Sequence, residues 1–329
     1  MLLDLFITHW TEDWSVGEKG FRMLSMQREV DWSQIRITMV HDGTEPFPEK
    51  YFKGMPFTVN QVSVPHGGIA AARNWCIDHS EAEWIKWCDF DDMFEGVYSL
   101  KIIMDALNSD RYDMIWFELL FDDHGKIINR TNRDPVFVHN KVFRRSFLQR
   151  KNIRFNEELT WCEDSAFLAV VEMDIDKLRI HKIRSFIPIY VYIVRDGSLC
   201  NKPEIRFANL ESFFRRHCYV AEEYRKRNRY DDYCQMCVRT IADSYYTLVK
   251  APGITEDKSG LEKRVWEWYR ENRQAIRDCK RPQRELVMKA VNKERFDGGK
   301  ITWEEIQEWI EGKEEAHETD NTGRILRWS

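Results

Sequence analysis

The first 110 residues alternate between short apolar runs and longer amphipathic stretches. Mostly apolar residues at 2–8 and 83–88, strict alternation at 35–40 and a further short segment at 58–64 predict strands. Residues 16–28, 69–79 and 97–107 carry apolar side chains at helical spacing and predict helices between those strands. Strands that alternate with helices are typical of βαβ units, so the pattern predicts an α/β fold with a mostly parallel central sheet.

The pattern continues to about residue 201 and then changes. Residues 114–121, 177–182 and 186–194 predict further strands, and residues 163–173 predict a helix. From Lys202 onward, long charged stretches with helical spacing dominate. We therefore expect two regions, an α/β domain over residues 1–201 and a helical region over residues 202–329. The polar tail beyond Gly312 is expected to fray.

Composition and charge narrow the class of protein. The 50 basic and 55 acidic residues give a net charge of −5 over 329 residues, which gives no general argument for nucleic acid or an anionic membrane as partner. The longest apolar run, residues 186–194, is too short for a transmembrane segment, which needs about twenty residues. The eight cysteines are scattered along the chain, as is typical of a reducing compartment, so we expect a cytoplasmic protein.

The candidate chemistry begins with three carboxylates at the end of the fourth predicted strand. Asp89, Asp91 and Asp92 lie within four residues, and such crowded acidic side chains are typical ligands of a hard divalent cation. A solvated turn that caps the next helix is the alternative, because Asp is favoured there. In parallel sheets, ligands bind beyond the carboxyl ends of the strands. Asp42 and Gly67 also fall at such ends, so we expect them to converge with the acidic group.

The order of these pieces resembles family 2 glycosyltransferases, which have the GT-A fold. The strings that carry the resemblance are residues 6–11, 40–44, 68–74, 88–92, 141–145, 161–164 and 192–198. Two departures matter. The loop Thr8-His9-Trp10-Thr11 replaces the family's Pro-x-Tyr-Asn, and the Gln-x-x-Arg-Trp string of the processive synthases is missing. The resemblance therefore implies a non-processive enzyme that transfers one sugar.

The resemblance also implies a role for each matching residue. Those expected to bind the donor, a nucleoside diphosphate sugar and most simply a UDP-sugar, are Thr8, Trp10, Asp42, Arg73, Asp89, Arg195 and Ser198. Within this group, Asp42 and Arg73 would bind the base and Asp89 the ribose. Asp91 would coordinate Mn²⁺ or Mg²⁺ together with Asp89 and Asp92. Arg73 and Asp42 could alternatively be a helix-surface ion pair and a turn residue.

Two adjacent acids, Glu163 and Asp164, begin a predicted helix and complete the expected site. In the family, an acid at this place is the base that deprotonates the acceptor hydroxyl, which implies an inverting transfer with Asp164 as the base and Glu163 as its substitute. Both could instead simply stabilise the helix N-terminus. A catalytically inactive nucleotide-sugar-binding protein and a nucleotidyltransferase remain alternative functions.

The acceptor stays open at this point. A glycan, a protein, a small molecule and a hydroxylated DNA base are all compatible with the sequence. Arginines and tyrosines are interleaved over residues 215–230 of the helical region, where they could bind an acceptor. Neighbouring acidic residues dilute their charge, so a solvated helix face is the alternative.

Overall fold

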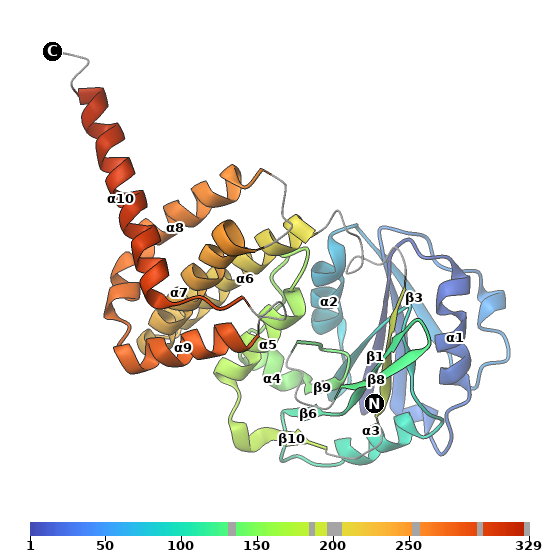
Figure 1. Cartoon of the computed structure of the whole chain (residues 1–329). Coiled ribbons are helices and arrows are strands. Elements are labelled where there is room, and N and C mark those ends of the chain that lie inside the picture. Colours follow the sequence, from blue (N-terminus) through green and yellow to red (C-terminus); the bar gives the residue numbers. More distant parts are fainter. Residues whose placement is uncertain (131–135, 184–187, 196–205, 252–256, 295–298, 326–329) are drawn as a thin grey trace. The chain divides into compact units, whose positions relative to one another are not determined.

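The computed structural model describes residues 1–130, 136–183, 188–195, 206–251, 257–294 and 299–325 (Figure 1). The chain divides into two compact units, residues 1–205 and 206–329. Among the described residues, no helix has both the length and the apolar character needed to cross a membrane.

The first unit is built on a seven-stranded sheet with the strand order β10-β6-β9-β4-β1-β2-β3. Strands β3, β2, β1 and β4 are mutually parallel, whereas β9 is antiparallel to both of its neighbours. The bounds of the seven strands are β1 Leu3–His9, β2 Ile35–Asp42, β3 Val59–Val64, β4 Trp84–Asp89, β6 Met114–Trp116, β9 Lys141–Arg144 and β10 Ile180–Lys182. The predicted α/β fold with a mostly parallel sheet is confirmed.

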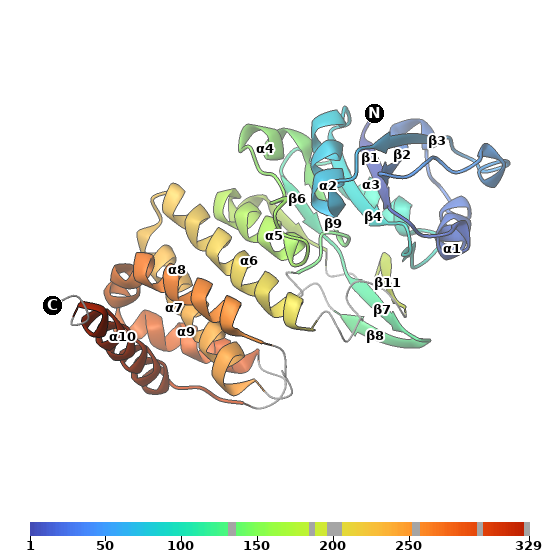
Figure 2. The ribbon, with the colours of Figure 1, turned by 90° about the horizontal axis from the view of Figure 1, so that it is seen from above.

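Helices cover both faces of this sheet, which explains why all seven residues of β1 are buried, the polar side chains of Asp4, Thr8 and His9 among them. Side chains of α1 (Trp14–Ser25) and α3 (Ser99–Leu107) pack with one face in a shared apolar cluster. On the other face, α2 (Gly68–His79) lies against β1 and β2, and Phe167 of α5 (Glu163–Asp174) contacts Trp87 of β4. Figures 1 and 2 show α1 and α2 on opposite sides of the strands.

A second, four-stranded sheet has the order β5-β11-β7-β8. Its strands are β5 Met93–Phe94, β7 Leu119–Asp123, β8 Lys126–Arg130 and β11 Tyr190–Val194. The single strand expected over residues 114–121 is therefore wrong, because the chain leaves the large sheet after Trp116 and enters the small one at Leu119. Phe117 makes this passage possible by pairing its backbone N–H and C=O with Asn140, at 2.9 and 3.0 Å.

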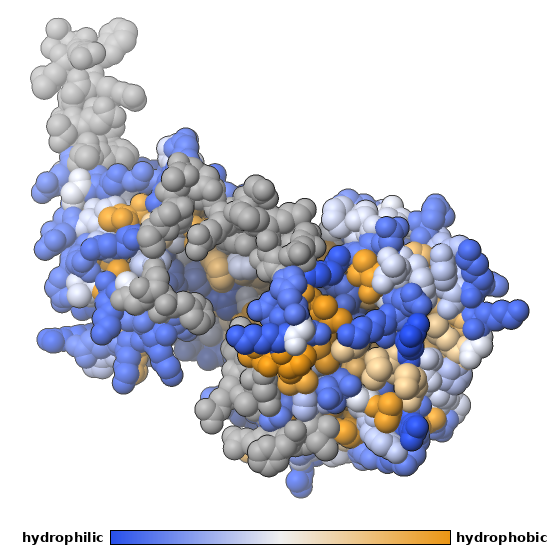
Figure 3. All heavy atoms as spheres, turned by 45° about the vertical axis from the view of Figure 1, so that its right-hand side comes forward, coloured by the Kyte–Doolittle hydropathy of each residue, from blue (hydrophilic) through white to orange (hydrophobic). Residues whose placement is uncertain are grey.

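The second unit is helical, as the charged periodic stretches predict. Its helices are α6 Arg206–Lys226, α7 Tyr230–Tyr245, α8 Ser259–Asp278, α9 Arg281–Lys293 and α10 Trp303–Ile325. The remaining short helix, α4 Arg145–Arg150, is part of the first unit. Thr302 and Glu305 form a capping box at the start of α10. α10 continues past Gly312 to Ile325, over the stretch where a frayed tail is expected from the sequence. Figure 3 shows one face of the molecule, on which polar side chains prevail and apolar ones gather in separate places.

Candidate active site

The carboxyl ends of β1, β2 and β4 bring three of the predicted donor residues to one edge of the large sheet. The register pairs Thr8 with Asp89 across β1 and β4. The hydroxyl of Thr8 donates to Asp89 Oδ1 at 3.1 Å. Asp42 ends β2, the other neighbour of β1. Parallel pairing thus produces the convergence that the sequence pattern predicts.

Arg73 is the central cation of the site. It lies on α2, it is 1% exposed, and its guanidinium donates to Glu163 at 3.0 Å, to Asp89 at 3.1 Å and to Asp164. Burial opposes a charged guanidinium, but the carboxylates outweigh it and raise the pKa of Arg73. One buried cation therefore holds three acidic side chains that come from two distant segments. The structure places Arg73 with the candidate bases rather than with Asp42.

The two candidate bases differ in their surroundings. Asp164 is 7% exposed, and beyond its contact with Arg73 it accepts the backbone N–H of Val138 at 3.1 Å. Burial, and then the charge of Asp164, raise the pKa of Glu163 from 4.5 to about 7. Cys162, just before both acids, has the left-handed backbone angle φ 66°, which is uncommon outside glycine and directs the start of α5 toward Arg73.

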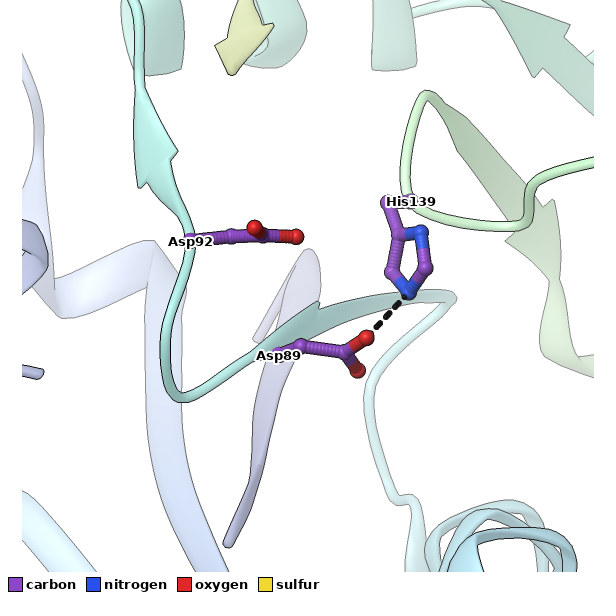
Figure 4. A group of neighbouring side chains, drawn as sticks. All are labelled: Asp89, Asp92 and His139. Carbon is purple, nitrogen blue, oxygen red and sulfur yellow. Dashed lines mark ion pairs between the residues drawn. The ribbon is translucent and has the colours of Figure 1, made fainter. Parts of the chain in front are cut away.

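Asp89 and Asp92 form a small group with His139, drawn in Figure 4. One ligand atom from each residue lies within 4.8 Å of the others. His139 Nε2 is 2.8 Å from Asp89 Oδ2, and the Asp92 carboxylate points toward the same space. Burial acts to raise the pKa of Asp89, but His139 and Arg73 outweigh it and hold that pKa below its usual range.

Asp92 is the most deeply buried carboxylate of the predicted metal group. It is 5% exposed and accepts hydrogen bonds from the Tyr190 hydroxyl at 3.0 Å and from the Ile193 backbone N–H at 2.9 Å. Burial, followed by the charges of Asp91 and Asp89, raises the pKa of Asp92 well above its ordinary value. Tyr190 OH also accepts the N–H of Asp89 at 3.0 Å, so β11 fixes the turn that carries the three aspartates.

Asp91 lies outside the group drawn in Figure 4 and is paired with Arg195. Arg195 Nε donates to Asp91 Oδ2 at 2.6 Å, and Arg195 Nη2 donates to Glu12 Oε1 at 3.2 Å. Burial and the charge of Asp89 raise the pKa of Asp91, which Arg195 only partly offsets. Ser198, the other residue expected at the diphosphate, lies outside the described residues.

Asp42 and Trp10 lie around the loop that precedes α2. Asp42 accepts the backbone N–H groups of Gly67 and Gly68, at 2.8 and 3.0 Å, and thereby satisfies amides at the helix N-terminus. The positive φ of Gly68, 83°, makes this turn possible. His66 Nδ1 is 2.9 Å from Asp42 Oδ2, and its ring stacks on Trp10 with 5.4 Å between ring centres and 10° between planes. Trp10 is 44% exposed, so this pair is a flat aromatic surface open to solvent.

The residues present suit a divalent cation. Burial raises the pKa of Asp91, Asp92 and Glu163, with neighbouring carboxylates as the second cause in each case. Five acids, Asp89, Asp91, Asp92, Glu163 and Asp164, gather here around two arginines, Arg73 and Arg195, and repel one another. A cation with oxygen and imidazole ligands would relieve that repulsion, and Asp89, Asp92 and His139 offer such ligands within 4.8 Å.

Several residues of the site escaped the sequence-based interpretation. His139 and Lys86 are buried, and the Lys86 ammonium donates to the His139 carbonyl oxygen and lies 4.7 Å from the centre of the Tyr190 ring. Glu12 is the third. His66 falls in the Pro65–Gly68 break that marks a strand end, where it could bind donor or metal, but a satisfied loop histidine is the more common role and His66 is therefore not part of the expected site. Lys86 is a charged residue inside a mostly apolar strand, which is a usable signal.

Comparison with known proteins agrees with this geometry. The succinoglycan biosynthesis protein ExoM of Rhizobium meliloti (strain 1021) is 26% identical over 89 residues, which are 26% of this chain and 29% of that protein. The structure of S. aureus TarS 1–349 with UDP-GlcNAc has 16% identity, a TM-score of 0.63 and coverage of 89% of this chain and 86% of that one.

The TarS 1–349 structure with UDP has 17% identity and a TM-score of 0.60, covering 89% of this chain and 84% of that one. No protein-family model matches the chain. The similarity to glycosyltransferases that the sequence motifs indicate is thus confirmed, and the chain has the GT-A fold.

Proposed function

We propose that this protein is an inverting, metal-dependent glycosyltransferase that moves one sugar from a nucleoside diphosphate sugar to an acceptor hydroxyl. The observation that carries the proposal is the buried group at the carboxyl edge of the parallel sheet, where Arg73 joins Asp89 to Glu163 and Asp164. Asp89, the acid proposed to bind the donor, and the two candidate bases surround a single cation at the edge where α/β sheets bind ligands, which supports the proposal.

The donor is expected to be a UDP-sugar. The TarS structures of the same fold are complexes with UDP and UDP-GlcNAc. In this chain, Trp10 and His66 offer a stacking surface for the base, and Asp42 lies against His66. A carboxylate can accept about four hydrogen bonds, and Asp42 receives three from the loop, so it retains capacity for an N–H of uracil.

Asp91, Asp89 and Asp92 would hold Mn²⁺ or Mg²⁺, with His139 as a further ligand. Bound there, the metal ion would neutralise charge that develops on the departing diphosphate. The chain's own residues prepare this position. The Lys86 ammonium holds the His139 loop through the His139 carbonyl, and the Tyr190 hydroxyl holds the aspartate turn through Asp89 and Asp92. Burial keeps the carboxylates in a medium where charge interactions are strong.

A carboxylate at the start of α5 would accept the proton of the attacking hydroxyl, with Asp164 as the proposed base. Arg73 and the Val138 N–H orient its carboxylate. The pKa of Glu163 is raised to about 7, so Glu163 can be protonated near neutral pH. Protonated Glu163 no longer repels Asp164, which can then stay ionised as the base. A single displacement assisted by one base inverts the anomeric carbon and requires no covalent intermediate.

The helical unit is proposed to contribute to acceptor binding. Arg225 on α6 is exposed and paired with Glu222 three residues earlier, with 2.7 Å between Nε and Oε2. A paired arginine on a helix surface retains donors for a further anionic or polyhydroxylated partner.

Metal-dependent donor binding tests the proposal directly. The protein should be titrated with UDP and with UDP-GlcNAc, each with Mn²⁺ and with a chelator, and donor hydrolysis should be followed in parallel. We expect Asp91→Ala to abolish hydrolysis and the metal-dependent part of nucleotide binding. Asp105→Ala, on the exposed face of α3, is the matched control. Full hydrolysis in the presence of chelator would show that the metal assignment is wrong.

The same measurements separate the alternative functions. A nucleotide-sugar-binding protein without activity would bind UDP-GlcNAc and Mn²⁺ but release no UDP on long incubation. A nucleotidyltransferase would release pyrophosphate from a nucleoside triphosphate and a sugar phosphate, whereas a glycosyltransferase releases the nucleoside diphosphate.

A further inference from the structure

His9 and His41 lie side by side at the carboxyl ends of β1 and β2. The parallel register pairs the two residues, which are 6% and 0% exposed. The distance between their Nδ1 atoms is 2.9 Å, within the range of a hydrogen bond between two imidazole rings. The next residues along the chain are Trp10 and Asp42, which are proposed to bind the base of the donor. The histidine pair therefore joins the two segments that carry the base site.

The partners of the outer ring nitrogens determine how many protons the pair carries. His9 Nε2 is 2.9 Å from the carbonyl oxygen of Glu12, which can only accept, so this nitrogen carries a proton. His41 Nε2 is 3.1 Å from Gln61 Oε1. The Gln61 amide has a fixed orientation, because its Oε1 accepts the Phe47 N–H at 2.8 Å and its Nε2 donates to the Phe47 carbonyl at 2.9 Å. His41 Nε2 therefore carries a proton as well.

The contact between the two Nδ1 atoms requires a third proton. Two unprotonated Nδ1 atoms would direct lone pairs at each other across 2.9 Å, whereas one proton between them forms a hydrogen bond. Three protons on two rings give the pair one positive charge. Burial, followed by the charge of His9, lowers the pKa of His41 to about 4, so the additional proton belongs to His9. Thr44 Oγ1, 3.3 Å from His9 Nδ1, can accept from the same proton.

The surroundings of the pair leave this charge without a counter-ion in contact. Phe47 and Phe90 lie 4.7 and 4.8 Å from the His9 ring, measured between ring centres. Among the described residues, no acidic side chain makes a hydrogen bond or ion pair with either ring. The neighbouring segments do carry titratable groups, which are Glu12, Glu18, Asp42, Glu45, His66 and Asp89. The carboxylates of Glu12 and Asp42 bind backbone N–H groups of the adjoining loops instead.

We propose that His9 and His41 share one proton as a buried imidazole–imidazolium pair, and that this pair positions the base site by holding the loop after β1 to the loop after β2. The two histidines act through Trp10 and Asp42, so they are positioning residues. The proposal rests on the proposed function, because it requires a nucleotide base at this edge of the sheet.

The shared proton can have this effect because each ring is anchored to a different loop. The Glu12 carbonyl holds His9 to the loop that carries Trp10, and Gln61 holds His41 to the loop that carries Phe47. When the proton leaves, two lone pairs face each other and the rings move apart, so Trp10 and Asp42 lose their relative placement. The protonated pair should thus bind nucleotide more tightly, and nucleotide should in turn favour the protonated pair.

The experiment combines nuclear magnetic resonance with UDP binding in the full chain. Spectra of protein with ¹⁵N-labelled histidine distinguish protonated from unprotonated ring nitrogens, and the His41 variants assign the pair among the nine histidines. Calorimetry measures the affinity for UDP with saturating Mn²⁺ at pH 6 and at pH 9. Thermal unfolding of each variant checks that the fold is retained.

Two substitutions of His41 separate the hydrogen bond from the charge. In His41→Asn the side-chain amide can donate to a neutral His9, so the two loops stay joined without a shared proton. His41→Leu removes the bond altogether. His79→Asn is the matched control, because the His79 ring also makes a hydrogen bond, to the Trp75 carbonyl at 2.9 Å, and stacks on the Trp75 ring, but at the end of α2.

At pH 6, we expect three protonated nitrogens among the four of the pair in wild type. The ratio of UDP affinities at pH 6 and pH 9 should be about tenfold or more larger in wild type than in His41→Asn, as loss of one hydrogen bond to a charged group implies. Ionisation of UDP and of the acidic groups is common to both proteins and cancels in this comparison. His41→Leu should bind UDP weakly at both pH values, and His79→Asn should follow wild type.

Three results would overturn the proposal, and they differ in what they say of the proposed function. Two protonated nitrogens at pH 6 would show that the pair is neutral. Three protons with the same pH dependence in wild type and His41→Asn would show that the pair is structural only. In both cases UDP binding, and with it the proposed function, still stands. If wild type binds no UDP at either pH, the donor assignment in the proposed function is wrong and the positioning role fails with it.

Discussion

Replacement of Asp164 by Asn is the change that tests the proposed base most directly. Asn has nearly the same shape, and its side-chain oxygen can still accept the Val138 N–H that Asp164 binds at 3.1 Å. Arg73 keeps its contacts with Asp89 and Glu163 at 3.1 and 3.0 Å. The variant therefore loses the negative charge while most of the local framework remains, and we expect it to fold.

The magnitudes follow from these contacts. General-base assistance contributes about 10²- to 10⁴-fold, so kcat should fall by roughly that factor. A hydrogen bond to a charged group contributes about 1.5–3 kcal/mol, and relief of repulsion with Glu163 offsets part of its loss, so the free energy of unfolding should fall by less than about 3 kcal/mol. Donor affinity should stay near wild type, because Asp164 contacts neither Asp42 nor the Trp10 surface in this scheme.

The pH dependence gives a second, independent readout. The charge of Asp164 is the second cause, after burial, of the Glu163 pKa near 7. In wild type we expect an inflection of the hydrolysis rate near that pH, because protonation of Glu163 changes its hold on Arg73. In Asp164→Asn the inflection of the residual rate should move to lower pH, and in Glu163→Gln it should disappear.

The assay is release of UDP from UDP-GlcNAc with Mn²⁺, measured from pH 5 to pH 9 for wild type, Asp164→Asn and Glu163→Gln. A near wild-type rate in Asp164→Asn together with an inactive Glu163→Gln would assign the base to Glu163. Activity in both variants would refute the reasoning, since the start of α5 would then be only a structural anchor for Arg73.

Three further predictions concern the donor, stability and the acceptor. Trp10→Ala should weaken UDP binding about 5- to 150-fold, as loss of base stacking costs about 1–3 kcal/mol, whereas Tyr98→Ala, 45% exposed in wild type, should have no effect by calorimetry. The pKa of Glu163 rises from 4.5 to about 7 on folding, so its contribution to stability is present below pH 4.5 and is lost as the pH rises through 7. When urea unfolding is compared at low and high pH, wild type should therefore lose up to about 3 kcal/mol of unfolding free energy that Glu163→Gln does not lose. Arg225→Glu should raise the KM for an acceptor found by screening and leave donor hydrolysis unchanged; equal loss of both activities would mean that α6 only supports the fold.

The sequence alone determined the order of elements in the first unit. The strands are mostly apolar or alternate between apolar and polar positions, and the helices between them show their own period. For this reason β1, β2, β4 and the helices α1 and α2 were predictable within a few residues. Parallel connection then implies that strand ends meet at one edge. The convergence of Thr8 and Asp89 follows from local pattern and this topological rule together.

The sequence also located both acidic groups but not their partners. Asp89 and Glu163 lie 74 positions apart, and no spacing in the chain shows that a single guanidinium joins them. Arg73 contacts both because α2 and α5 lie on the same face of the sheet, which only tertiary packing decides. The split of residues 114–121 between two sheets was likewise beyond local pattern, since both halves have the same strand character.

The charge states of the site depend on tertiary structure for the same reason. Burial and neighbouring carboxylates raise the pKa of Asp91, Asp92 and Glu163, although isolated side chains of these types titrate alike wherever they stand in a sequence. The pairing of Arg195 with Asp91 and Glu12 joins segments more than 100 residues apart. Residue type determines which chemistry is available, and the packed fold decides which groups share a charge, because electrostatic interactions act through space and not along the chain.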